Sequence, residues 1–191
     1  GILMVQGLVN SFGPVTMAAF AAAVKIDSFA YMPVQDFGNA FSTFIAHNYG
    51  AKKEDRIRRG MKSAFLCAFF FCLIISLLVC VFAKPLMQIF VSAGETEIIA
   101  AGVHYLHIEG SFYFGIGLLF LLYGLYRAIA RPGMSVVLTV ISLGTRVALA
   151  YILSAVPWIG VTGIWMSVPI GWVLADLTGV LYYIHISRKR N

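Results

Sequence analysis

Long apolar stretches follow one another along this chain and constrain its fold more than any other feature. A helix needs about 20 mostly apolar residues to cross the hydrocarbon core of a bilayer. We expect helices at about residues 1–12 (truncated), 16–47, 63–83, 99–130, 134–154 and 161–186. The residues are 60% hydrophobic and 12% charged, which is typical of a membrane protein. The sequence therefore predicts an all-α membrane protein, a six-helix transmembrane bundle over residues 1–191 whose first helix is truncated.

Charged residues in the connections indicate how these helices are oriented. Residues 51–62, the segment with Arg127 and Arg131, and residues 187–191 are basic. The alternate connections, "SFGPV", "SAGETE" and "SAVPWIG", hold two glutamates and neither lysine nor arginine. Because Lys and Arg stay on the cytoplasmic side, we expect a multi-pass protein of the cell membrane with a cytoplasmic C-terminus. Lys84 lies at the opposite end, where its side chain can snorkel to the interface.

Several function classes find little support in the sequence. The net charge of +6 sits at membrane boundaries rather than in a nucleic-acid-binding element. The three cysteines share one apolar stretch without a CxxC pair. His104, His107 and Glu109 are close in sequence, but His107 and Glu109 point about 200° apart on a helix. We therefore predict no metal site, no catalytic residues and no enzyme activity.

The helix at 16–47 carries a continuous polar stripe. Successive residues rotate by about 100°, which brings six of them within about 40° of one line. These residues are Lys25, Met32, Asp36, Asn39, Thr43 and His47. Gln35 flanks the stripe, Asp27 falls on the opposite side, and Pro33 is expected to kink the helix. A charge near mid-membrane costs several kcal/mol, so the stripe should face protein or water.

Other predicted helices also have one polar or aromatic face. Glu109, Tyr113 and Tyr123 align with Arg127 on 99–130. Arg146 and Asp176 both lie about eleven residues from the cytoplasmic ends of antiparallel helices, so we expect a structural ion pair between them. Counting from the outer ends suggests Lys25 with Glu109 as a second pair.

The role of each polar residue has a structural alternative. The pathway candidates for substrate or ion are Asp36, Gln35, Asn39, Thr43, Glu109, Tyr113 and Tyr123. Intramembrane carboxylates suit proton or sodium coupling, but they can also serve packing alone, and aromatic residues pack by default. Glycines 38, 115, 117 and 124 indicate close helix contact rather than binding.

Two segments resemble the MATE (multidrug and toxic compound extrusion) family. Residues 30–60, "AYMPVQDFGNAFSTFIAHNYGAKKEDRIRRG", are similar to the segment in which a proline-containing helix runs into an N-x-G-A-[KR] cytoplasmic loop. Residues 126–154, "YRAIARPGMSVVLTVISLGTRVALAYILS", resemble the family's helix-loop-helix near the inner face. The resemblance covers nearly the whole chain and fits the carboxy-terminal half of a twelve-helix transporter.

The resemblance implies an exporter built of two six-helix halves around a central cavity that opens alternately inward and outward. Such proteins expel organic cations and other drugs in exchange for Na+ or H+. Two acidic positions of some members are not matched here. The seventh-helix acid falls near the truncated start, where only Gln6 and Asn10 are polar, and the tenth-helix acid corresponds more nearly to Gly115 than to Glu109.

We therefore predict secondary active efflux of small organic cations, with Na+ or H+ as the coupling ion and no resident cofactor. The expected partners are the missing amino-terminal half, the cationic substrates and the lipid bilayer, and no nucleic acid. A flippase for a lipid or lipid-linked saccharide is the alternative within the superfamily, and a noncatalytic membrane scaffold subunit is the alternative outside it. The sequence leaves open the substrate, the coupling ion and the oligomeric state.

Overall fold

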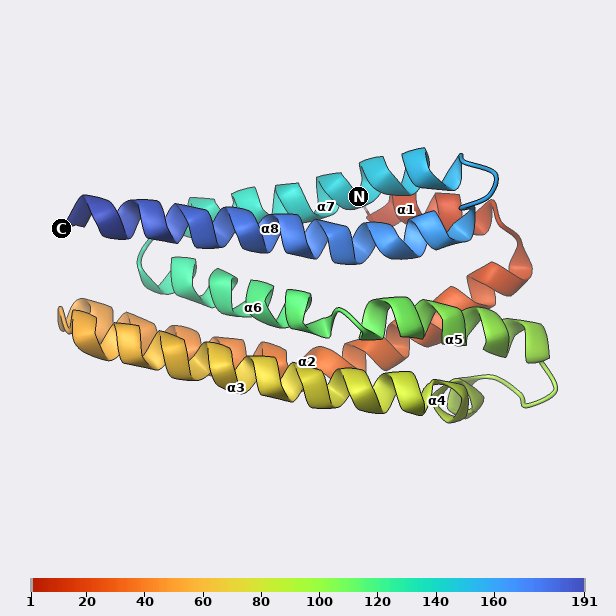
Figure 1. Cartoon of the computed structure of the whole chain (residues 1–191), viewed down its shortest axis with the longest axis horizontal. Helices are drawn as coiled ribbons and strands as arrows, with labels where there is room; N and C mark the ends of the chain where they lie inside the picture. Colours follow the sequence, from red (N-terminus) through yellow and green to blue (C-terminus); the bar gives the residue numbers. More distant parts are fainter. Residues whose placement is uncertain (1, 191) are drawn as a thin grey trace.

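The computed structural model describes residues 2–190, and all of their regular secondary structure is helical (Figure 1). The helices are α1 (Ile2–Asn10), α2 (Pro14–Gly50), α3 (Glu54–Val81), α4 (Ala83–Phe90), α5 (Thr96–Gly110), α6 (Tyr113–Ala128), α7 (Pro132–Ser154) and α8 (Val161–Arg190). Short turns join most of them, and the long helices run roughly parallel to one axis. The predicted all-α bundle is confirmed.

Helix length and composition match a membrane-embedded protein. Among residues 2–190, α2, α3, α7 and α8 are each long and apolar enough to cross a bilayer. Helices α5 and α6 pass the same test together but are bent by 52° at a short break, so they count as a fifth span if taken as one. The prediction of one continuous helix at 99–130 is therefore wrong, because the segment is divided into α5 and α6.

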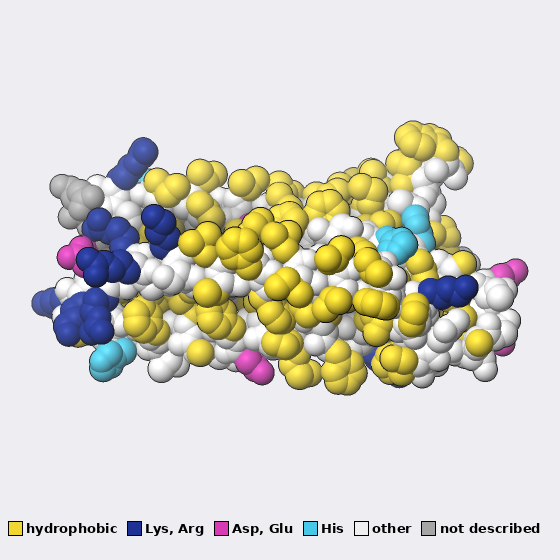
Figure 2. Space-filling model, turned by 60° about the horizontal axis from the view of Figure 1, so that its bottom comes forward, with side chains coloured by type: hydrophobic (Ala, Val, Ile, Leu, Met, Phe, Trp, Pro, Cys, Tyr) yellow, Lys and Arg dark blue, Asp and Glu magenta, His cyan; other side chains and the backbone are white. Residues whose placement is uncertain are grey.

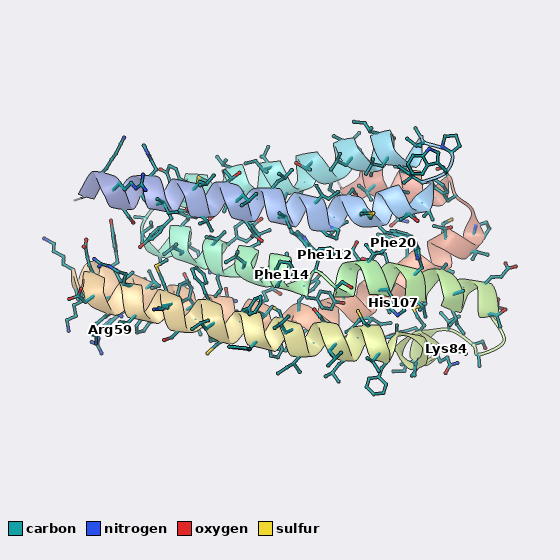
Figure 3. The ribbon with its side chains drawn as sticks, in the orientation of Figure 1. Phe20, Arg59, Lys84, His107, Phe112 and Phe114 are labelled. Atoms are coloured by element: carbon teal, nitrogen blue, oxygen red, sulfur yellow. The ribbon has the colours of Figure 1, made fainter. Side chains whose placement is uncertain are left out.

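The break between α5 and α6 has a local cause. Gly110 ends α5, and the Ser111 hydroxyl donates a hydrogen bond to the carbonyl oxygen of His107, which competes with the helical pattern. The amide of Phe112 then donates to the carbonyl oxygen of Glu109 at 3.1 Å in a tighter turn. Phe112 and Phe114 mark this break in Figure 3. It follows Glu109, a buried carboxylate described below, by two residues.

Two further boundaries differ from the expected ones. Helix α3 begins at Glu54 rather than near residue 63, because Glu54 and Asp55 occupy its first turn, where carboxylates stabilise the amino end of a helix. The short helix α4 follows α3 directly and is seen almost end-on in Figure 1, so its axis lies across the bundle. Lys84 of α4 is exposed at the end of the bundle opposite the C-terminus (Figure 3).

Helix α6 forms the centre of the bundle. It packs against α2, α3, α7 and α8, while α7 and α8 form the most extensive single pair. Most of its residues are buried, among them Leu121, Leu122, Leu125 and Tyr126. The α2–α3 turn, the α6–α7 turn and the end of α8 lie at one end of the bundle (Figure 1), where lysine and arginine side chains gather (Figure 2).

Candidate functional site

Asp27 of α2 is the centre of a buried polar cluster. Its side chain is 4% exposed and accepts two hydrogen bonds from tyrosine hydroxyls. Tyr105 of α5 donates to Oδ2 at 2.6 Å, and Tyr113 of α6 donates to Oδ1. Two phenols from either side of the helix break therefore hold one carboxylate in place.

Glu109, the penultimate residue of α5, lies beside this cluster. Its side chain is 0% exposed, and neither carboxylate oxygen has a hydrogen-bonding partner among residues 2–190. Asp27 and Arg146 are both near enough to act on it electrostatically. A buried carboxylate without partners is strongly disfavoured as an anion. A proton or a cation that neutralises the Glu109 carboxylate would therefore stabilise it in this position.

Arg146 of α7 supplies a positive charge that acts on this cluster. Its Nε is buried without a hydrogen-bonding partner in the described part of the chain. The charge acts on Glu109, on Tyr31 of α2 and on Tyr123 of α6. The guanidinium and the two carboxylates thus belong to one electrostatic system.

Asp176 of α8 is also buried, beside the first turn of α6. Its Oδ2 would lie 3.8 Å from a Cβ atom placed on Gly115, and its Oδ1 has no hydrogen-bonding partner within residues 2–190. Asp176 and Arg146 both act electrostatically on Tyr123 of α6, but Oδ1 of Asp176 and Nε of Arg146 each lack a hydrogen-bonding partner in the described part of the chain. The described contacts lend the Arg146–Asp176 pair no support, and it stays a prediction.

The suggested pair of Lys25 with Glu109 is wrong. Lys25 is exposed, and its Nζ lies 5.8 Å from the ring centroid of Phe90 in α4, where it makes a cation–π contact. The reason is rotational: Lys25 and Asp27 point to different sides of α2, and the side that carries Asp27 is the one that packs toward α5 and Glu109.

The polar stripe of α2 lies on a different surface from the buried cluster. Gln35, Asp36, Asn39 and Thr43 are all exposed on this chain. Nη2 of Arg127 donates to Oδ1 of Asn39 at 3.1 Å, which links the stripe to the basic end of α6. Their predicted role in a substrate or ion pathway is not tested by these contacts.

The remaining tyrosine candidates have structural contacts. Tyr113 contacts Asp27 and lies edge-on to Tyr31, with ring centroids 6.4 Å apart. The hydroxyl of Tyr123 accepts a hydrogen bond from Thr139 of α7 at 3.2 Å. Tyr113 thus belongs to the buried cluster, whereas Tyr123 joins α6 to α7.

The two histidines near Glu109 point to other partners. His104 Nε2 lies 3.0 Å from the hydroxyl of Thr162, and His107 Nε2 lies 2.9 Å from the carbonyl oxygen of Cys80. In the described part of the chain no group of three or more His, Cys, Asp or Glu residues is arranged to hold a metal ion. Both histidines therefore connect helices.

Comparison with known proteins places the chain in a family. The MatE family model matches residues 2–152, most of the chain. The chain belongs to the MatE family. Two curated relatives come from Bacillus subtilis strain 168: the probable multidrug resistance protein YpnP, 28% identical over 96% of this chain, and the probable multidrug resistance protein YoeA, 23% identical over 98%. This MatE chain spans 40% of the length of each.

Solved MATE structures share the fold of this MatE chain. A MOP superfamily transporter from Pyrococcus furiosus gives a TM-score of 0.91 at 20% identity, covering 100% of this chain and 43% of that one. A multidrug resistance MATE transporter in its outward-facing conformation gives 0.90 at 20% identity, covering 100% of this chain and 43% of that one. An inward-facing structure gives 0.88 at 21%, covering 97% and 43%. The chain therefore has the fold of a MATE half.

Sequence reasoning missed Asp27, although a signal was present. Asp27 lies on the apolar side of α2, on the same helical face as Ala23, Tyr31 and Val34. A carboxylate on an apolar face of a membrane helix needs a partner inside the protein. The stripe pattern does not include Asp27, which the fold buries against two tyrosines.

Proposed function

We propose that this chain forms one half of a secondary active exporter of organic cations and drugs. The exporter exchanges them for Na+ or H+ by alternating access, and the substrate binds between two halves near the middle of the membrane. Membership of the MatE family and the names of the Bacillus relatives, probable multidrug resistance proteins, support this role. The protein acts as a transporter rather than an enzyme, in the cell membrane, with its C-terminus in the cytoplasm.

The observation that carries the coupling part of the proposal is the buried pair of Glu109 and Asp27. Two tyrosine hydroxyls fix Asp27, whereas both oxygens of Glu109 lack partners among residues 2–190. Glu109 is therefore the group that gains most from a proton or a small cation. Its neutralisation removes the repulsion from Asp27, and its ionisation restores the attraction to Arg146.

The helix break allows a change of charge at Glu109 to change the bend between α5 and α6. Glu109 precedes the break between α5 and α6, and Tyr113 follows it. Discontinuous helices in transporters commonly mark ion and substrate sites. In our proposal, binding or release of a proton or cation at Glu109 alters the hydrogen bonds that Tyr105 and Tyr113 donate to Asp27. The bend between α5 and α6 changes as a result.

The exposed stripe of α2 is the proposed substrate surface of this half. Asp36 offers a negative charge, and Gln35, Asn39 and Thr43 offer side-chain oxygens to a bound cation. The separation of the stripe from the buried cluster assigns substrate binding and ion coupling to different residues. Mutations in the two places should therefore give different kinetic effects.

Proteoliposomes with the full-length transporter test these roles. Efflux of a cationic dye is measured under a Na+ gradient and separately under a pH gradient. Glu109→Gln and Asp27→Asn keep the side-chain shape but remove the titratable group, so we expect coupled efflux to fall to the level of protein-free liposomes. Asp36→Asn should raise the KM for the dye by roughly fivefold, equivalent to about 1 kcal/mol for a partly exposed charge pair.

Glu97→Gln, on the exposed first turn of α5, is the matched control and should transport normally. Full efflux by Glu109→Gln and Asp27→Asn under both gradients would make the buried acids structural and place coupling elsewhere. Absence of cation efflux from the unmodified protein under both gradients would refute the proposed function itself.

A further inference from the structure

A cleft of about 280 Å3 lies between the start of α3 and the end of α8. Ile57 and Arg58 line it from α3, and Tyr183, Ile184, Ser187 and Arg188 line it from α8. The two helices pack mainly against other partners, α3 against α2 and α6, and α8 against α7. The cleft therefore separates two helix ends that come from distant parts of the sequence.

An apolar face of α8 continues from the cleft. Leu177 and Leu181 are each more than half exposed and lie on the helical face that also carries Ile184 and Arg188. The exposed polar stripe lies on α2 instead. Figure 2 shows a face with hydrophobic side chains along its middle and most of its lysine and arginine at one end. This pattern is that of a surface in contact with lipid.

We propose that this cleft binds the headgroup of an anionic phospholipid. Arg58 and Arg188 place two guanidinium groups around one opening, and guanidinium groups bind phosphate oxygens in a bidentate manner. The hydroxyls of Tyr183 and Ser187 add donors for the same oxygens. Ile57 provides apolar surface for the glycerol and the first methylenes.

The orientation of the helices in the membrane requires basic residues at this end of the molecule. It does not require two of them to line the same cleft. The rule concerns the number of Lys and Arg residues near a membrane boundary, whereas the cleft brings Arg58 and Arg188 together from α3 and α8. Glu54 also lines the cleft, and the two arginines outnumber its single carboxylate. Basic pockets between helices at the cytoplasmic surface are suited to anionic headgroups.

A lipid bound here would tie the inner ends of α3 and α8 to each other. The assignment of this lipid to the inner leaflet rests on the proposed function, because the orientation of the chain in the membrane is part of that proposal. The binding itself depends on the cleft and not on transport. A measurement of lipid binding therefore succeeds or fails independently of any efflux assay.

Native mass spectrometry of the full-length transporter in detergent measures the binding directly. The probes are phosphatidylglycerol and phosphatidylcholine with identical acyl chains. We expect phosphatidylglycerol to bind more tightly, and the double variant Arg58→Gln with Arg188→Gln to lose this preference. Each basic residue near an anionic lipid contributes about fivefold in affinity, so the pair should contribute roughly 25-fold.

Arg59→Gln with Lys189→Gln is the matched control. It removes the same number of charges from the same two helix ends, but neither side chain lines the cleft, and Arg59 points away from α8 (Figure 3). The control should lose less than about threefold, because both side chains are exposed outside the cleft and act on the headgroup only through water and salt, without a direct hydrogen bond. The variant Arg58→Lys with Arg188→Lys keeps both charges and should retain most of the preference.

Four outcomes would overturn the proposal. The first is an equal loss of affinity in the cleft pair and the control pair. The second is binding of phosphatidylcholine as tight as that of phosphatidylglycerol. The third is displacement of the lipid by millimolar inorganic phosphate, which would identify a soluble anion as the occupant. Protection of Ser187→Cys from a thiol reagent in lipid-free detergent would likewise show that another part of the transporter covers the cleft.

Discussion

The close approach of α2 and α6 at Gly124 allows a stability prediction with a magnitude. A Cβ atom at Gly124 would lie 2.8 Å from the carbonyl oxygen of Gly38 and 3.2 Å from Cβ of Ser42. Both neighbours belong to α2, and the first is backbone, so a methyl group forces the two helices apart. Gly124→Ala should therefore destabilise the bundle.

Three contributions set the size of the effect. Overpacking a close contact costs about 1 to 3 kcal/mol. The hydrogen bond that the Ser42 hydroxyl donates to the carbonyl oxygen of Gly124 at 2.8 Å is stretched, which costs about 1 kcal/mol. Alanine in place of glycine favours the helix by about 1 kcal/mol. The last two contributions cancel, and the expected loss in the free energy of unfolding is about 1 to 3 kcal/mol.

The thermal unfolding midpoint of the purified full-length transporter in detergent is a suitable assay, with a series of three variants. Gly144→Ala, where nothing lies within 4 Å of the added methyl group, should be neutral or raise the midpoint. Gly38→Ala, where the methyl group meets the carbonyl oxygen of Phe120 at 3.2 Å, should lower it slightly. Gly124→Ala should lower it by several degrees. A Gly124→Ala protein as stable as Gly144→Ala would refute the close contact of α2 with α6.

Two further predictions concern topology and charge coupling. Cysteines introduced at Gly94 and Pro157 should react with an impermeant thiol reagent from outside intact cells, and one at Lys53 should not, because basic connections stay inside; reversed labelling would refute the orientation. A double-mutant cycle of Arg146→Gln with Glu109→Gln should give a coupling energy of about 0.5 to 3 kcal/mol. The same cycle with Asp176→Asn in place of Glu109→Gln tests the predicted ion pair, which additive losses would rule out.

The sequence was sufficient for the place and order of the long helices. Long apolar segments have few alternatives to a membrane helix, because hydrocarbon cannot satisfy backbone hydrogen bonds. It was not sufficient for the break at residues 111–112. Glycine and serine are tolerated inside many membrane helices, so the pattern at Gly110 and Ser111 did not by itself predict an interruption.

The candidate site was predicted in part. Glu109 and Tyr113 were identified as inward residues, and the structure places both at the buried cluster. Asp36 was chosen in place of Asp27, because a continuous stripe is easier to detect than a single acid on an apolar face. The fold leaves the stripe exposed on this half and buries the isolated acid.

The sequence by itself determined that the chain crosses a membrane and that most of its charges lie at the helix ends, since an unpaired charge in hydrocarbon is costly whichever helices are its neighbours. Tertiary structure alone decided which face of each helix meets which neighbour. Lipid and protein interior are almost equally apolar, so hydrophobic periodicity does not distinguish a lipid-facing side from a packed one. Packing of α2 against α5 and α6 therefore directs Asp27 to Tyr105 and Tyr113 and turns Lys25 toward Phe90.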